Sequence, residues 1–277
     1  MADHCHVHPV FPLELQCIIL RMALENDMND AQNLLFISKD VFDCLIPILY
    51  KVVILRQRNQ LAWPPLALPI EKLPQYGRYV QHLLVTPTSV RDNGVDPYLQ
   101  YCPNIINFGR QEAFLPSQLE HLVRLPLTQL RLGNPAARSL PLIPSTFILF
   151  SKITHLDIKE PDITFLSHFP SLTHLILEED FDEDLDYEVC AEVLRQHPGL
   201  KVLIIHVPDF HTGSLPELDH EITPEMDLRV VHLNYWVIDT WRRKALGDPG
   251  NAWSVAERVV EERLARARAE AEGSSSH

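Results

Sequence analysis

The sequence predicts an α/β protein in which an N-terminal three-helix module is followed by an irregular array of strand-and-helix units that share a parallel sheet. Three observations support this prediction. An apolar pattern of the form L-x-x-L-x-L returns along most of the chain, a proline often stands just before it, and the N-terminal residues show helical spacing instead.

The recurring pattern is clearest at Leu172, Leu175 and Leu177, which follow Pro170. Leu175 and Leu177 are two residues apart, so on a strand they point to the same face. Proline cannot continue a helix, and it pushes the residue before it out of the helical region. Pro170 therefore marks the change from a helix to a strand, and each unit is expected to contain a strand, a loop and a helix.

The pattern begins at seven positions that are 19 to 28 residues apart. This spacing is close to the leucine-rich-repeat period of about 20–29 residues. No single unit can bury its own apolar side, whereas stacked units bury it continuously. We therefore expect a leucine-rich-repeat-like solenoid over residues 49–241, with a leading strand near Val52. The seven starts are Val80, Ile105, Leu127, Ile153, Leu172, Leu200 and Leu228.

Residues 10–48 are expected to form a separate helical module, after a disordered tail at residues 1–9. A short second helix is expected at residues 31–37, and Ser38 is a suitable N-cap for a third. Three such short helices bury little surface, so the module is expected to pack on the repeats or on a partner. The first helix has its apolar residues at the spacing i, i+3, i+4, i+7, namely Leu15, Ile18, Ile19 and Met22.

The module resembles the F-box as it occurs in F-box/leucine-rich-repeat proteins, and the segment from Asp227 to Trp241 is similar to fungal-type members of that family. The tryptophan that usually follows the start of the third helix is replaced here, with Phe42 as the nearest aromatic residue. The matching motifs are Pro12-x-Glu14-Leu15 with Ile18-Ile19, Ala31-x-Asn33-Leu34 with Ser38-Lys39, and Pro47-x-Leu49-Tyr50.

The resemblance implies a substrate-recognition subunit of a cullin–RING (SCF-type) ubiquitin ligase, in which the F-box docks a Skp-family adaptor and the repeats hold a protein substrate. The alternative is a non-catalytic repeat scaffold without a ubiquitin-ligase link, in which the same residues form only the module's core and its joint with the repeats. Carried over by position, the adaptor-binding residues are Pro12, Leu13, Leu15, Ile18, Ile19, Leu34, Ile37 and Phe42.

Polar residues between the inward leucines are expected to line the groove of the solenoid and to bind the substrate. Three histidines of this row, at positions 82, 155 and 174, directly precede an inward leucine, so neighbouring imidazoles could titrate near pH 6.5. The alternative is a tolerant, half-exposed repeat position. The expected substrate-binding residues are Gln129, Arg131, His155, Asp157, Lys159, His174, Glu178 and His206.

After the array, residues 242–277 are expected to form a helix, from about Ala252 to Ala271, and a flexible tail. The helix should pack by its first half and fray in its second. Four aromatic residues are expected to cover the open end of the repeat core, as terminal repeats do. They are Tyr235, Trp236, Trp241 and Trp253.

Composition excludes several functional classes. The net charge of −13 disfavours nucleic acid as a partner. Five scattered cysteines indicate reduced thiols in an intracellular protein, in the cytoplasm or nucleus, and the most apolar run is too short to span a membrane. Phosphate-binding and hydrolase motifs are missing, so we expect no enzyme and no cofactor. The histidines near the N-terminus and the acidic run at residues 178–188 are not expected to bind a metal.

Overall fold

The computed structural model describes residues 12–26, 34, 38–55, 68, 70–86, 95–133, 136–137, 144–159, 163–178, 187–207, 217–218, 227–234 and 237–274. The chain starts with helices α1 (Leu13–Asn26) and α3 (Lys39–Leu49). Ser38 caps α3 as predicted, because its side chain accepts a hydrogen bond from the Val41 N–H at 3.2 Å. The predicted helix at residues 31–37 lies, except for Leu34, outside the described residues, as do the N-terminal histidines and most of the acidic run.

The strands of the described residues form one nine-stranded sheet, and eight of them are parallel and follow one another in chain order. The predicted α/β class with consecutive parallel strands is confirmed. The eight strands are β1 (Val52–Leu55), β2 (His82–Val85), β3 (Asn107–Arg110), β4 (Gln129–Leu132), β5 (His155–Lys159), β6 (His174–Glu178), β7 (Val202–Val207) and β9 (Val230–Asn234). The short β8 (Glu217–Leu218) pairs antiparallel with β9 at the end of the sheet.

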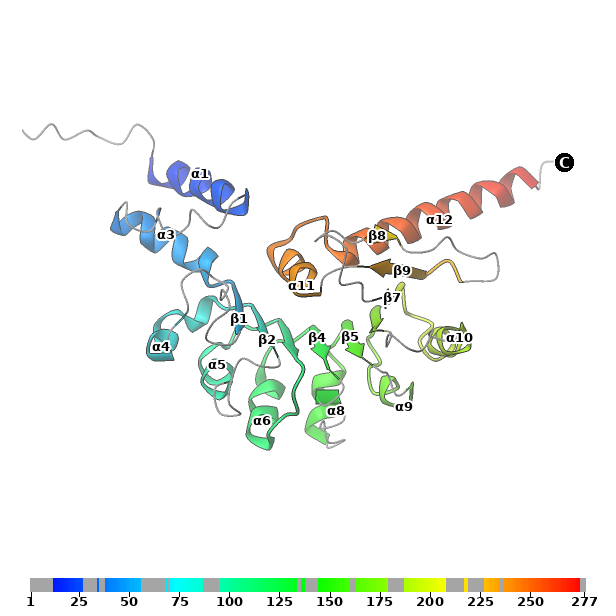
Figure 1. Ribbon diagram of the computed structural model, residues 1–277, viewed down its shortest axis with the longest axis horizontal. Coiled ribbons are helices and arrows are strands. Elements are labelled where there is room, and N and C mark those ends of the chain that lie inside the picture. The colour runs from blue at the N-terminus through cyan, green and yellow to red at the C-terminus, as the bar shows by residue number, and fades with distance from the viewer. Residues whose placement is uncertain are drawn as a thin grey trace, which may run out of the picture.

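The sheet is arched, and a row of helices lies along the face that we call the outer face (Figure 1). Leucines and other apolar residues of alternate strand positions, such as Leu83, Phe108 and Leu175, are fully buried there. Between β1 and β2 the chain also forms the short helical turns η2 (Ile70–Lys72) and η3 (Gly77–Tyr79). The outer helices are α4 (Leu73–Tyr76), α5 (Asp96–Tyr101), α6 (Pro116–Arg124), α8 (Pro144–Phe150), α9 (Ile163–Leu166) and α10 (Tyr187–Gln196).

The opposite, inner face of the sheet is covered by the chain's own C-terminal helices, α11 (Val237–Leu246) and α12 (Ala252–Ser274) (Figure 1). Trp241 packs on β1 and β2, and Trp253 packs on the strands from β5 onward. The two tryptophans therefore cover a face of the sheet rather than the open end of its core, which corrects the prediction. The other two predicted covering residues, at positions 235 and 236, lie outside the described residues.

The junction between α11 and α12 follows from local sequence. Gly247 has φ of +80°, a backbone conformation that ends helices and that glycine adopts without strain. Asn251 then caps α12, because its side-chain oxygen accepts hydrogen bonds from the N–H groups of Trp253 (3.1 Å) and Ser254 (3.2 Å). The predicted boundary at residue 241 falls inside α11, and α12 continues as one helix to Ser274, slightly beyond the predicted end near Ala271. None of the helices in the described ranges combines the length and apolarity that a membrane crossing requires.

Candidate functional sites on the N-terminal helices and the inner face

Helix α1 carries a row of exposed apolar side chains, which we call the α1 stripe: Leu15, Ile18 and Ile19. These residues are 46%, 53% and 51% exposed, and Leu13 and Met22 at the two ends of the row are exposed as well. Pro12, which precedes the helix, is also exposed. Five of the eight predicted adaptor-binding residues thus lie on or next to one accessible surface.

The remaining predicted adaptor-binding residues do not join the α1 stripe. Leu34 and Phe42 are half-buried and pack against a small cluster formed by α3, whose centre is Leu45. Ile37 lies outside the described residues. Leu20 of α1 packs against the same cluster, so α1 uses one side for α3 and presents the other to solvent.

The two helices of this module are also joined covalently. Cys17 of α1 and Cys44 of α3 form a disulfide, with their Cα atoms 6.1 Å apart. The prediction that the cysteines are reduced is therefore wrong for this pair, because the helix packing brings together two thiols that are distant in sequence. Cys102 and Cys190 are buried and belong to no disulfide among the described residues.

All eight predicted substrate-binding residues lie on the inner face, because strand register aligns alternate positions of neighbouring strands. The expected open groove is not found over them, since α11 and α12 cover this face. Three of the eight side chains are buried and the other five are partly buried: the first group is Arg131, His174 and His206, and the second is Gln129, His155, Asp157, Lys159 and Glu178.

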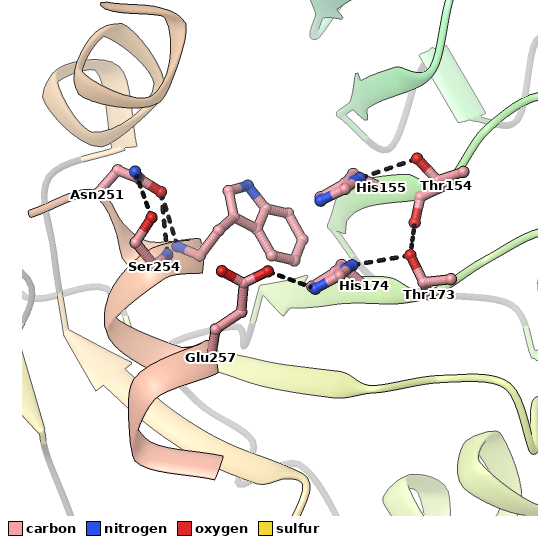
Figure 2. A network of polar contacts seen from close by, with 8 residues as sticks. Thr154, His155, Thr173, His174, Asn251, Ser254 and Glu257 are labelled. Carbon is pink, nitrogen blue, oxygen red and sulfur yellow. Dashed lines mark hydrogen bonds and ion pairs between the residues drawn. The ribbon is translucent and has the colours of Figure 1, made fainter. Parts of the chain in front are cut away.

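The imidazoles of His155 and His174 are stacked, with ring centroids 4.2 Å apart and planes 2° from parallel. Trp253 of α12 meets both rings edge-on, at 5.2 and 5.7 Å between centroids. Figure 2 shows the carboxylate of Glu257, also from α12, directed toward His174, with Oε1 and Nε2 2.9 Å apart. The histidines are therefore part of the interface between the sheet and α12.

The threonine before each histidine fixes the orientation of the ring (Figure 2). The Thr173 hydroxyl donates to the carbonyl of Thr154 at 3.1 Å, and Thr154 donates in the same way to the preceding strand. Each hydroxyl has a single proton, so it accepts from the imidazole beside it: His155 Nδ1 at 2.9 Å and His174 Nδ1 at 2.8 Å. In the neutral imidazole, Nε2 then carries no proton and can only accept a hydrogen bond. The contact between Nε2 of His174 and the carboxylate of Glu257 therefore requires an additional proton on one of the two groups.

A charged cluster lies next to the histidines on the same face. The buried guanidinium of Arg131 bonds to the carboxylates of both Asp157 and Glu178. His206 lies beside Glu178, with its Nδ1 3.8 Å from the carboxylate oxygen. One arginine thus pairs with two carboxylates from the two following strands, so this part of the row forms internal ion pairs.

Burial changes the proton affinities of these groups. It lowers the pKa of His82 to about 3 and that of His155 to about 2, with the positive charge of Lys244 as a further cause for both. Burial also lowers the pKa of His174, although Glu257 opposes this effect. At His82 and His155 the pKa therefore lies well below the value near 6.5 that an acid-sensing row of imidazoles would need, because α11 and α12 exclude water from these two rings.

The pKa values of the two carboxylates in the cluster are shifted in opposite directions. Burial raises the pKa of Asp157 to about 7, even though Arg131 acts to lower it. For Glu178, burial is outweighed by Arg131, His206 and other cations, so its pKa is lowered.

Two charged residues of the C-terminal helices were not predicted as part of any site. Lys244 of α11 places Nζ 4.3 Å from the centre of the Trp253 ring, and burial lowers its pKa well below the usual value. Glu257 lies at the histidine stack. Both belong to segments whose charged residues alternate with apolar ones, a pattern that equally describes a solvent-exposed helix face.

Among the described residues, no group of histidine, cysteine and acidic side chains has the arrangement of a metal site. The sequence matches no protein-family model, and no curated protein matches it.

Proposed function

We propose that this protein is a substrate-recognition subunit of a cullin–RING ubiquitin ligase, which docks a Skp-family adaptor through its N-terminal helices and a protein substrate through its repeat-like sheet-and-helix array. The exposure of the α1 stripe is the observation that carries this proposal. The F-box-like motifs provide the family context, and the parallel strands in chain order are compatible with leucine-rich repeats.

The α1 stripe has the properties of a helix-docking surface. Its residues recur at helical spacing, and each leaves roughly half of its side chain exposed. Full burial of a leucine or isoleucine contributes about 1.5–3 kcal/mol, so covering the exposed halves of Leu15, Ile18 and Ile19 would contribute roughly 2–5 kcal/mol. This is a substantial fraction of the roughly 8 kcal/mol that corresponds to micromolar affinity.

The substrate side of the proposal depends on the C-terminal helices. The inner-face residues are covered by α11 and α12, and Trp253 and Glu257 contact the histidine stack directly. A substrate would reach these residues only if α11 and α12 moved away from the sheet. Other surfaces of the repeat array remain accessible without such a change.

The adaptor half can be tested by co-purification of the full-length protein with a Skp-family adaptor. The double substitution Leu15→Asp and Ile19→Asp places two charges in the α1 stripe and should abolish the complex with an unchanged circular dichroism spectrum. Arg21→Asp is the matched control, because Arg21 is exposed on the same helix outside the stripe. Binding that survives the double substitution, or wild-type protein that never binds the adaptor, would contradict the proposal.

The alternative function, a repeat scaffold without a ligase link, has support from the packing of the module. Ile46 and Tyr50 at the end of α3 belong to the main core of the sheet, and Leu246 of α11 packs against the α1–α3 cluster. A purely structural module predicts that deletion of residues 1–48 causes aggregation and that no adaptor is ever recovered with the intact protein.

A further inference from the structure

Helix α1 is attached to the rest of the chain through α3, which lies between α1 and the sheet (Figure 1). The apolar cluster that joins the two helices takes one side chain, Leu20, from the described part of α1, and Leu20 is itself only half-buried. An isolated helix of 14 residues is marginal in water. The position of α1 therefore depends strongly on its covalent link to α3, the disulfide between Cys17 and Cys44.

The disulfide also determines which side of α1 faces outward. Cys17 and Leu20 are three residues apart, so they lie on one side of the helix, the side that contacts α3. Ile18 and Ile19 of the α1 stripe point to the other side, and both are exposed. The bond between Cys17 and Cys44 thus fixes the rotational setting of the helix in which the α1 stripe faces solvent.

The disulfide is accessible, whereas the other described cysteines are not. Cys17 and Cys44 are each only partly buried, so a small thiol can approach their sulfur atoms. Cys102 and Cys190 are buried, and burial raises the pKa of the Cys102 thiol to about 12. Since the thiolate is the reactive form of cysteine, Cys102 takes no part in thiol exchange near neutral pH. Redox chemistry at the described cysteines is therefore directed to the pair that joins α1 and α3.

We propose that the disulfide between Cys17 and Cys44 is a redox latch, which holds α1 on α3 in the oxidised form and releases α1 when a dithiol reduces it. The consequence for adaptor docking rests on the function proposed above, whereas the release of α1 does not. A released α1 loses the preset orientation of the α1 stripe. A docking partner must then order the helix as it binds, and this ordering lowers the affinity.

The exchange is balanced between the protein and the dithiol. One thiolate of the dithiol attacks a sulfur of the bond between Cys17 and Cys44, which forms a mixed disulfide and releases the other cysteine as a thiolate. The second thiol of the reagent then displaces the attacked cysteine. Two electrons and two protons pass to the cysteine pair in total, and the reagent leaves as a cyclic disulfide. An excess of a small disulfide reverses the reaction.

Amide hydrogen exchange of the full-length protein, followed by mass spectrometry, tests the latch without any partner. Dithiothreitol should speed the exchange of the α1 amides at least about tenfold, because a disulfide commonly shifts a conformational equilibrium by more than one order of magnitude. The amides of α6 should exchange at an unchanged rate. Iodoacetamide added after reduction should modify Cys17 and Cys44 and leave Cys102 unmodified.

The double variant Cys17→Ser and Cys44→Ser is the matched control, because it cannot form the bond. Its α1 amides should exchange as fast as those of reduced wild type, with or without dithiothreitol. The latch is overturned if oxidised wild type contains no bond between Cys17 and Cys44, or if α1 exchanges equally fast in both redox states. It is also overturned if reduction speeds the exchange of α6 as much as that of α1, because the bond then supports the whole fold.

Co-purification with a Skp-family adaptor in the two redox states separates the latch from the proposed function. Reduced wild type should bind the adaptor about tenfold more weakly than oxidised wild type. Equal affinity in both states, with α1 released in one of them, would refute the link between the latch and docking. An adaptor that binds neither form refutes the proposed function, while the exchange rates of α1 still decide the latch.

Discussion

Replacement of Arg131 by methionine should destabilise the protein severely. The Arg131 guanidinium is buried and bonds to two carboxylates, Asp157 and Glu178, whose side chains are only 13% and 12% exposed. Methionine fills a similar volume but leaves both carboxylates without their cation. The substitution therefore tests whether this cluster is an internal structural element or a surface that solvent reaches.

The expected magnitude follows from the burial of the cluster. Removal of one partner from a buried ion pair costs about 3–5 kcal/mol, because the remaining charge stays desolvated. Natural proteins are stable by about 5–15 kcal/mol, so this loss is a large fraction of the total. It corresponds to a decrease in melting temperature of roughly 10 °C for a chain of this length.

Urea unfolding followed by tryptophan fluorescence at pH 5.5 and pH 8 is the appropriate assay. The pKa of Asp157 is already raised to about 7, and loss of Arg131 raises it further, together with that of Glu178. A group with a raised folded-state pKa loses its stabilising contribution as pH rises through that pKa. The loss in free energy of unfolding caused by Arg131→Met should therefore be larger at pH 8 than at pH 5.5.

Arg195→Met is the matched control. Arg195 also pairs with a carboxylate, Glu192, but it is 71% exposed and lies on the same helix as its partner, so its replacement should leave the free energy of unfolding unchanged. An Arg131→Met deficit that is as small as that of the control, or that does not change with pH, would refute the description of a desolvated cluster.

Two further predictions concern acid stability and packing. Neutral His82 and His155 stabilise the folded protein above pH 6.5, and this contribution is lost as pH falls toward their folded pKa values of about 3 and 2. Between pH 7 and pH 4.5 each histidine lowers the free energy of unfolding by about 2.6 kcal/mol, whereas protonation of Asp157 raises it by about 3 kcal/mol. The net loss of about 2 kcal/mol should appear as a lower urea midpoint at pH 4.5 than at pH 7. Gly77→Ala should destabilise by about 1–3 kcal/mol, because the added Cβ would lie 2.3 Å from a backbone carbonyl oxygen, whereas Gly199→Ala has no atom within 4 Å and should be neutral in the same unfolding assay.

The sequence predicts the strands well because their apolar residues are under a simple constraint. The leucines at positions 172, 175 and 177 lead into and lie within β6, and their equivalents mark each of the other parallel strands. Alternation alone cannot tell which partner covers which face when both faces are apolar. Val231 and Leu233 follow the leucine pattern, yet they pack against α12 on the inner face and not against the outer helices.

The candidate sites show the same limit. Helical spacing predicted the α1 stripe, but it could not separate Leu15, which is exposed, from Phe42, which packs inward. Strand periodicity located the polar residues of the inner face. It could not predict that α11 and α12, which are distant in sequence, pack over them. The sequence around Lys244 and Glu257 contains no local signal of that contact.

Helix α11 reaches back to the first two strands, where Trp241 and Ala245 cover Val52, Ile54 and Leu84. In an array whose units touch only their neighbours, each unit could mature as it leaves the ribosome. Here β1 and β2 lack this cover until α11 has been synthesised, roughly ten to thirty seconds later at about 5–20 residues per second. The nascent chain consequently carries the apolar inner surface of β1 and β2 uncovered throughout that interval.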